Sequence, residues 1–496
     1  MSKTTSGSIL NIIVLYGALI LGFLGTFMKA RIITPAEIGV LSSLVTISAL
    51  AGFFLNLGTP VGIIKYSPEL RDDKHELTGF YVFNLLLSLC AYVLVCTGFI
   101  VFRSYVLKYF HDELLAKYFD FVFILMIGEV FNNQFRSIYQ VFKRSVSANV
   151  IYNITTRSAN IVMLCFMYFG FFDFYTFLLV DILSVVFKSV LFVAGYLRFG
   201  VVALPSFRFL SKKFLKKYFN YSFYMLFSGV IALLVNSIDK IMIGHYVDMA
   251  GVGVYRVVLT FIVLIEFIGK GFSMTNSPLI ASYWRKEEVG KLKKLYNENV
   301  NQQLILGLFA FSALIAFGTD LLTILGKAYE TGFYVLLFLS LGELINVGTG
   351  LSGAIISFSR YYKLEFYIRI LLVVLTYFTN TLFIPIWGVS GAAFATMLSV
   401  FLCNLVQFIF VSWYLKLQPY DLESVRILLL NALMALAFWG VKHIFGKSSI
   451  PAIIGISAVL FLIYLWLGIY LFKLPNMKSS VQKIFRRKAS APAEQD

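Results

Sequence analysis

The chain has 496 residues, of which 59% are hydrophobic and 14% charged, and its mean hydropathy is +0.83. This composition excludes a water-soluble globular protein and predicts an integral membrane protein, because about 20 mostly apolar residues suffice to cross the hydrocarbon core of a bilayer. The formal net charge of +17 would suit a nucleic-acid-binding protein, but the basic residues are placed as membrane-loop anchors, so we expect no nucleic-acid partner.

Fourteen apolar segments follow one another along the chain and leave no room for a soluble domain. We expect each to form a transmembrane helix, so the predicted fold is an all-α polytopic membrane protein with about 14 spans. The first segment lacks the charged region and cleavage site of a signal peptide and is predicted to be a span. The predicted spans are 9–28, 38–64, 79–102, 118–141, 150–170, 174–197, 218–243, 250–282, 298–318, 333–358, 364–384, 388–415, 424–444 and 451–472.

Basic residues concentrate in alternate loops. The termini and the even-numbered loops carry 26 Lys and Arg, whereas the odd-numbered loops carry 8. The positive-inside rule therefore predicts that both termini are cytoplasmic. The basic loops are expected to contact the anionic head groups of membrane lipids.

An internal repeat appears when the chain is shifted by 214 residues. The segment ITPAEIGV at 33–40 then lies over VDMAGVGV at 247–254, which pairs Gly39 with Gly253. The shift maps six spans onto six with the same orientation, as in transporters whose site lies between two parallel lobes. The predicted domains are an N-terminal six-helix lobe at 1–210, a C-terminal six-helix lobe at 211–420, two additional helices at 421–475 and a cytoplasmic polar tail at 476–496.

Charged residues inside the spans are candidates for function, because their burial in hydrocarbon is costly. Eight are basic and five are acidic, and this excess of positive charge predicts a cavity for an anion such as a phosphate or pyrophosphate. The bases are Arg136, Arg157, Lys188, Lys240, Arg256, Lys270, Arg369 and Arg426, and the acids are Glu129, Asp181, Asp239, Glu266 and Glu343.

Two arginines are expected to line this cavity. Arg157 shares a predicted helical face with Asn153, Thr156 and Asn160, and Arg136 lies in the polar stretch NNQFRS. A polar face inside a span is expected to point at water or at cargo.

Other bases allow a simpler interpretation. Lys188 and Arg426 could extend to the cytoplasmic interface. Lys29 and Arg31, at the outer end of the first span, could be interface anchors or the exit of an anion path.

Asp239 and Lys240 are neighbours in sequence, so they do not face each other on a helix. Asp239 could carry a coupling cation or proton, or it could only hold Lys240 or Arg256 charged. Glu266 is one turn before Lys270 and is its expected static partner. The predicted substrate-binding residues are Arg31, Arg136, Arg157, Arg256, Lys270 and Arg369, and the predicted ion-coupling residues are Asp239, Glu129 and Glu343.

Catalytic and cofactor motifs are missing from the sequence, which has no HExxH, Walker A or CxxC pattern. We therefore expect neither an enzyme nor an ATP-driven pump, and no metal or other cofactor. A membrane-embedded polymerase or ligase is also disfavoured, because the longest outer loop, 103–117, is short.

Four segments resemble the signatures of a transporter family. ARIITPAEIGVLSSLVTI at 30–47, SIDKIMIGHYVDMAGVGVY at 237–255, LGKAYETG at 325–332 and IWGVSGAAFAT at 386–396 are similar to patterns of the polysaccharide transport (Wzx-like) family. This family belongs to the multidrug/oligosaccharidyl-lipid/polysaccharide exporter superfamily, and the resemblance covers essentially the whole chain. Arg31 and Asp239 match charged positions of the family pattern.

The resemblance implies two six-helix lobes around a central cavity and transport by alternating access. It implies a flippase that moves undecaprenyl-pyrophosphate-linked oligosaccharide to the outer leaflet of a bacterial cytoplasmic membrane, for surface polysaccharides such as O-antigen, lipopolysaccharide or capsule. Glycosyltransferases or a glycan polymerase would be partners. The alternative in the same fold is an H⁺- or Na⁺-coupled exporter of drugs or metabolites, whose cavity should hold more acids than bases.

Overall fold

The computed structural model describes residues 3–200, 202–475 and 477, which fold into helices without a strand. In this part of the chain, twelve helical segments are long and apolar enough to cross a membrane. The all-α polytopic prediction is therefore confirmed. The predicted polar tail at 476–496 lies outside the described residues, except for Met477.

The chain divides into two compact units, Met1–Val257 and Val258–Asp496. The predicted boundary between the two lobes, at residue 210, was derived from the internal repeat and stays a prediction. The N-terminal unit contains α1 (Lys3–Ile32), α2 (Pro35–Asn56), α3 (Thr59–Tyr66), η1 (Ser67–Leu70), α4 (Lys74–Val101), α5 (Arg103–Phe110), α6 (Glu113–Tyr118), α7 (Phe121–Val141), α8 (Ser145–Asn149), η2 (Val150–Ile154), α9 (Thr155–Tyr168), α10 (Phe174–Leu197), α11 (Lys212–Tyr246) and the first turns of α12 (Met249–Arg285).

The C-terminal unit continues from α12. Its helices are α13 (Val289–Leu325), η3 (Lys327–Gly332), α14 (Phe333–Thr349), α15 (Ser352–Phe358), α16 (Tyr362–Ile409), η4 (Phe410–Tyr414), α17 (Leu422–Phe445) and α18 (Ile450–Tyr470).

Glycines in left-handed or related conformations break several predicted spans. Predicted span 38–64 is two helices, because α2 ends at Asn56, before Leu57 and Gly58, whose φ angles are 48° and 72°. Predicted span 333–358 is likewise divided at Gly350, with φ 60°. A residue without a Cβ atom adopts such angles at little cost.

The predicted eleventh and twelfth spans are the two arms of α16, which reverses direction at Gly388 (φ 56°, ψ −134°). The hydroxyls of Thr379 and Ser399 lie 3.0 Å apart across the arms. A Cβ atom on Gly391 would overlap the carbonyl oxygen of Phe383. The lack of a side chain at Gly391 therefore allows the chain to approach the backbone of Phe383 closely.

Capping side chains fix where the helices begin. Thr34 accepts a hydrogen bond from the Glu37 amide (3.3 Å), and the Glu37 carboxylate accepts one from the Thr34 amide (2.9 Å). This capping box starts α2 with Pro35 in its first turn. Before α10, hydrogen bonds from the side chain and amide of Thr176 hold the pKa of Asp173 below its usual range.

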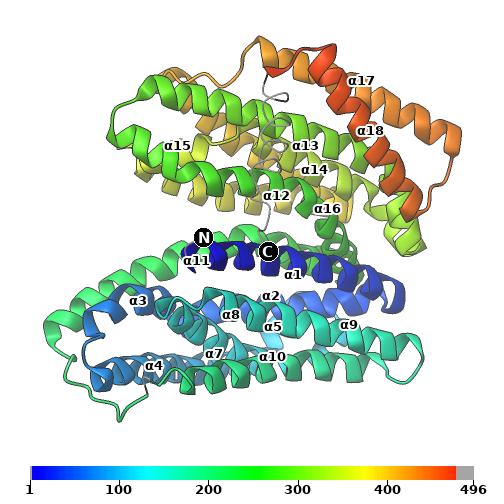
Figure 1. Cartoon of the computed structure of the whole chain (residues 1–496). Helices are drawn as coiled ribbons and strands as arrows, with labels where there is room; N and C mark the ends of the chain where they lie inside the picture. The colour runs from blue at the N-terminus through cyan, green and yellow to red at the C-terminus, as the bar shows by residue number, and fades with distance from the viewer. Residues whose placement is uncertain (1–2, 201, 476, 478–496) are drawn as a thin grey trace, which may run out of the picture. The chain divides into compact units, whose positions relative to one another are not determined.

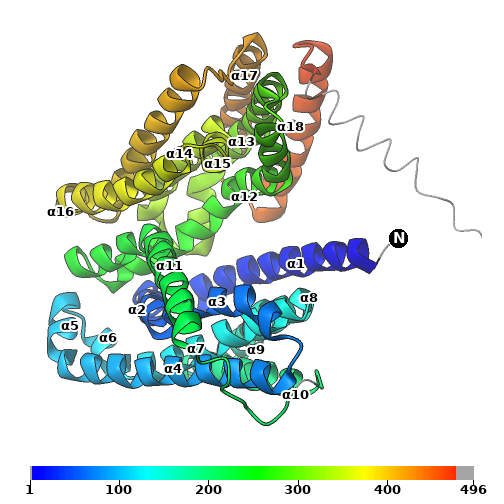
Figure 2. The ribbon, with the colours of Figure 1, turned by 90° about the vertical axis from the view of Figure 1, so that its left-hand side faces the viewer.

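The helices of the N-terminal unit pack around a strip of aromatic side chains. Helices α4, α7 and α10 run side by side (Figure 1), and α11 crosses α2 and α3 (Figure 2). Tyr66, Phe80, Tyr139 and Tyr218 are buried where these helices meet. In the C-terminal unit, α13 packs against α14 and α17, and α18 packs against α17.

The two copies of the repeat motif touch each other inside the N-terminal unit. A Cβ atom on Gly39 of α2 would overlap the Met249 carbonyl and lie 3.1 Å from the Gly253 amide of α12. A Cβ atom on Gly253 would in turn overlap the carbonyl of Pro35. The glycines paired by the 214-residue shift therefore allow the first turns of α2 and α12 to approach at backbone distance.

Candidate functional site

The N-terminal unit encloses a cavity of about 540 Å³ with a charged lining. Its walls come from α1, α2, α7, η2, α9, α10, α11 and the start of α12. Five bases and two acids line it, an excess of three positive charges among the described residues. The bases are Lys29, Arg157, Lys188, Lys240 and Arg256, and the acids are Glu129 and Asp181.

Arg157 is held at the contact between α9 and α1. Its guanidinium donates a hydrogen bond to the carbonyl of Ala18. A Cβ atom on Gly22 would lie 2.8 Å from the Arg157 Nη1 atom. The absence of a side chain at Gly22 therefore provides the room in which the guanidinium lies against α1.

A π-helical turn, η2, brings Tyr152 to the cavity wall immediately before α9. Two cations lie over its ring: the Lys188 Nζ atom is 4.4 Å and the Arg136 Cζ atom 4.7 Å from the centroid. Attraction between a cation and the electron-rich ring face fixes all three side chains. Arg136 also donates to the Asn149 side-chain carbonyl at 3.4 Å. Turns of π-helix inside α-helices occur frequently at functional sites.

Lys188 corrects one expectation from the sequence. Its side chain is 6% exposed and lines the cavity, so it does not extend to the interface. Asp181, Val185 and Lys188 lie at i, i+4 and i+7 on α10, and all three line the cavity. Glu129 on α7 accepts a hydrogen bond from Asn133 at 3.0 Å.

The side chains of the neighbours Asp239 and Lys240 lie in different surroundings, as the helical geometry predicts. Lys240 lines the cavity, whereas Asp239 is buried and accepts a 2.6 Å hydrogen bond from the Tyr255 hydroxyl. Lys29 lines the cavity as well. Arg31, two residues further along α1, is exposed and lies 5.9 Å from the ring centroid of Phe27.

The remaining predicted residues belong to the C-terminal unit. Lys270 forms the expected ion pair with Glu266 (2.5 Å) and is 60% exposed. Glu343 accepts a hydrogen bond from Asn346 (3.3 Å), which in turn accepts one from Asn404 (2.7 Å).

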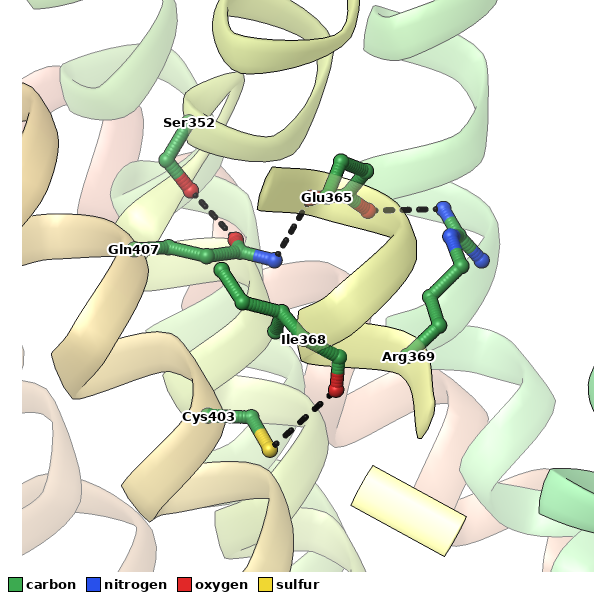
Figure 3. Close-up of polar contacts among 6 residues, drawn as sticks. All are labelled: Ser352, Glu365, Ile368, Arg369, Cys403 and Gln407. Carbon is green, nitrogen blue, oxygen red and sulfur yellow. Dashed lines mark hydrogen bonds and ion pairs between the residues drawn. The ribbon is translucent and has the colours of Figure 1, made fainter. Parts of the chain in front are cut away.

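Arg369 is held by a polar network in the same unit. Its guanidinium lies 2.9 Å from the Glu365 carboxylate. Figure 3 shows that the Glu365 carboxylate also accepts a hydrogen bond from the Gln407 side-chain amide (3.1 Å). The side-chain carbonyl of Gln407 in turn accepts a hydrogen bond from the Ser352 hydroxyl (3.0 Å). The network ties the first turn of α16 to α15.

Of the nine predicted site residues, the structure brings Glu129, Arg157 and Arg256 to the cavity of the N-terminal unit. Arg136 lies over the Tyr152 ring and does not line the cavity. The cavity also contains four charged residues that were not predicted as site residues: Lys29, Lys188, Lys240 and Asp181. The signal that could have found Lys29 is its i+7 spacing from Gly22, which lines the same wall.

Comparison with known proteins places this chain in a family. Residues 5–284 match the sequence profile of the family described as polysaccharide biosynthesis protein. Two curated relatives come from Haloferax volcanii. The probable low-salt glycan biosynthesis flippase Agl15 is 21% identical over 233 residues, which are 47% of this chain and 49% of the relative. The probable flippase AglR is 23% identical over 172 residues, 34% of this chain and 36% of the relative. The chain thus spans half or less of the length of these relatives.

Solved structures show the same fold. The lipid II flippase MurJ in its inward closed conformation has a TM-score of 0.72 at 13% identity, covering 94% of this chain and 99% of MurJ. An inward-facing multidrug resistance MATE family transporter of the MOP superfamily has a TM-score of 0.63 at 16% identity. The match covers 82% of this chain and 98% of the transporter. The resemblance found in the sequence is confirmed. This chain is a multi-pass membrane protein with the fold of the multidrug/oligosaccharidyl-lipid/polysaccharide exporter superfamily, and it belongs to the polysaccharide biosynthesis protein family.

Proposed function

We propose that this protein is a flippase for a lipid-linked oligosaccharide whose glycan is joined to the lipid, undecaprenol, through pyrophosphate. It moves the cargo from the inner to the outer leaflet of a bacterial cytoplasmic membrane, by alternating access, to supply cell-surface polysaccharide synthesis. The observation that carries the proposal is the cavity in which five bases face two acids. The family match and the flippase relatives support the same class of cargo.

The charge of the cavity suits a pyrophosphate. An unpaired anion inside a membrane protein is costly, and preplaced ammonium and guanidinium groups offset that cost. A head group with about two negative charges would also move outward down the membrane potential, which contributes about 2.3 kcal/mol per charge per 100 mV. The bases therefore need only lower the barrier at mid-membrane.

The wider set of predicted residues belongs to the same proposal. Arg31, Arg136, Lys270 and Arg369 would contact the head group at other stages of transport. Glu129, Asp239 and Glu343 would carry a coupling ion. Cytoplasmic termini, with glycosyltransferases or a polymerase as partners, complete the proposal.

The alternative is a cation-coupled exporter of drugs or metabolites. The fold is compatible with it, because a multidrug transporter has the same fold. A cationic cargo would be repelled by a cavity with three excess positive charges. The charge of the cavity therefore favours the flippase.

The test is flipping of a fluorescent undecaprenyl-pyrophosphate oligosaccharide in proteoliposomes, with and without a pH gradient. We expect Arg256→Ala and Lys240→Ala to slow flipping roughly tenfold or more, because a charge-assisted hydrogen bond contributes about 1.5–3 kcal/mol. The matched control is Arg103→Ala, which removes a base paired with Asp120 (3.1 Å) outside the cavity and should leave the rate unchanged.

Two results would count against the flippase. Equal rates for wild type and both cavity variants would remove the cavity from the transport path. A folded wild type that moves no lipid-linked glycan but exports small cations down a pH or Na⁺ gradient would establish the exporter instead.

A further inference from the structure

One wall of the cavity differs chemically from the others. The bases come from α1, α10, α11 and α12, with Arg157 the single base that α9 contributes. Around Arg157, α9 and the preceding η2 turn present Asn153, Thr156 and Asn160, which are neutral and polar. Their i, i+3 and i+7 spacing puts them on one helical face.

The amides of this wall have unused hydrogen-bonding capacity. The side chains of Asn153 and Asn160 form no hydrogen bond with any residue that the structure describes, whereas the asparagines Asn56 and Asn84 each bond to the carbonyl one turn earlier in their helices. Each amide offers two donors and one acceptor oxygen. A polar group in a membrane span is costly without a partner, so these amides are positioned for water or for a ligand.

Amides and cations recognise different parts of a ligand. Ammonium and guanidinium groups bind phosphate, whereas an amide that both donates and accepts matches the hydroxyl and acetamido groups of an uncharged sugar. We propose that the wall formed by Asn153, Thr156 and Asn160 binds the sugar that is attached directly to the pyrophosphate. This inference rests on the proposed function and adds a glycan-reading subsite to it.

The position of Arg157 argues for the first sugar rather than a distant one. It follows Asn153 of η2 by four residues and precedes Asn160 of α9 by three, so a phosphate at its guanidinium would leave the adjoining sugar beside both amides. The cavity volume, about 540 Å³, falls in the usual range for a small-molecule site, about 300–1,000 Å³. That volume suits a head group and its first sugar better than a long glycan.

The test compares two ligands on the full-length protein in lipid nanodiscs. One is undecaprenyl pyrophosphate without sugar, and the other carries a single N-acetylhexosamine. We expect Asn153→Leu and Asn160→Leu to weaken binding of the glycosylated lipid about tenfold and to leave the sugar-free lipid unchanged. Arg256→Ala should weaken both. Asn153→Ser and Asn160→Ser, which keep a polar group, provide a second pair of variants if the leucine variants do not accumulate.

Asn236→Leu is the matched control, because Asn236 is exposed, bonds to the Ala232 carbonyl of its own helix (2.8 Å) and does not line the cavity. It should bind both lipids as wild type does. If the Asn153 and Asn160 variants lose both lipids equally, or neither, the glycan subsite is refuted while the anion site stands. If wild type binds neither lipid, or Arg256→Ala binds both normally, the proposed function itself fails, and the subsite with it.

Discussion

Replacing Gly39 or Gly253 by valine is expected to abolish the accumulation of folded protein or to leave it without transport activity. The Cβ atom at either position would overlap a backbone carbonyl, that of Met249 or of Pro35. Rotation of a side chain cannot relieve an overlap with backbone, so the first turns of α2 and α12 would have to separate. Overpacking in well-packed proteins costs about 1–3 kcal/mol and sometimes more.

The measurement is the yield and melting temperature of the detergent-solubilised protein, followed by flipping in proteoliposomes. Gly98→Val is the matched control, because Gly98 is also helical but a Cβ atom added there would have no neighbouring atom within 4 Å. The control carries the same change in helix propensity without the overlap. A Gly39→Val protein that melts and transports like the control would show that the two repeat motifs need not touch.

Removal of Lys442 is expected to destabilise the C-terminal unit by about 3 kcal/mol. Lys442 on α17 pairs with Asp320 on α13, and the same carboxylate accepts a 3.0 Å hydrogen bond from the Ser448 amide. The Asp320 side chain is 7% exposed and that of Lys442 is 24% exposed. Lys442→Leu therefore leaves a buried carboxylate without its cation, and breaking one side of a buried pair costs about 3–5 kcal/mol.

Asp320→Leu should cost less, because the remaining ammonium can reach water. The double variant Asp320→Leu/Lys442→Leu should recover part of the loss, since no buried charge remains. Thermal unfolding of the four proteins gives the interaction energy as a double-mutant cycle. Lys294→Leu, which removes an exposed partner 3.8 Å from Glu298, should change stability by less than about 0.5 kcal/mol. A Lys442→Leu protein as stable as this control would show that the pair does not hold α17 to α13.

Much of the fold follows from the sequence because hydrocarbon imposes strict requirements. Each predicted span is helical in the structure, including 118–141, which corresponds to α7. The division of α16 near Gly388 was predicted, because the sequence already separates the spans 364–384 and 388–415. The breaks at Gly58 and Gly350 were not predicted, because a glycine in a membrane helix more often serves close packing than a break.

The candidate site was only partly predictable. The sequence by itself determined that bases outnumber acids in the predicted spans, and from this excess it predicted an anion as the cargo. It did not determine that Lys29 would line the cavity while Arg31 would not, or that Lys188 would turn inward. In a soluble protein the apolar face of a helix reveals which side is buried, but in a membrane the lipid-facing and core-facing sides are both apolar. Only the packing of neighbouring helices, with Gly22 making room for Arg157 and η2 turning Tyr152 toward two cations, decided which charges converge.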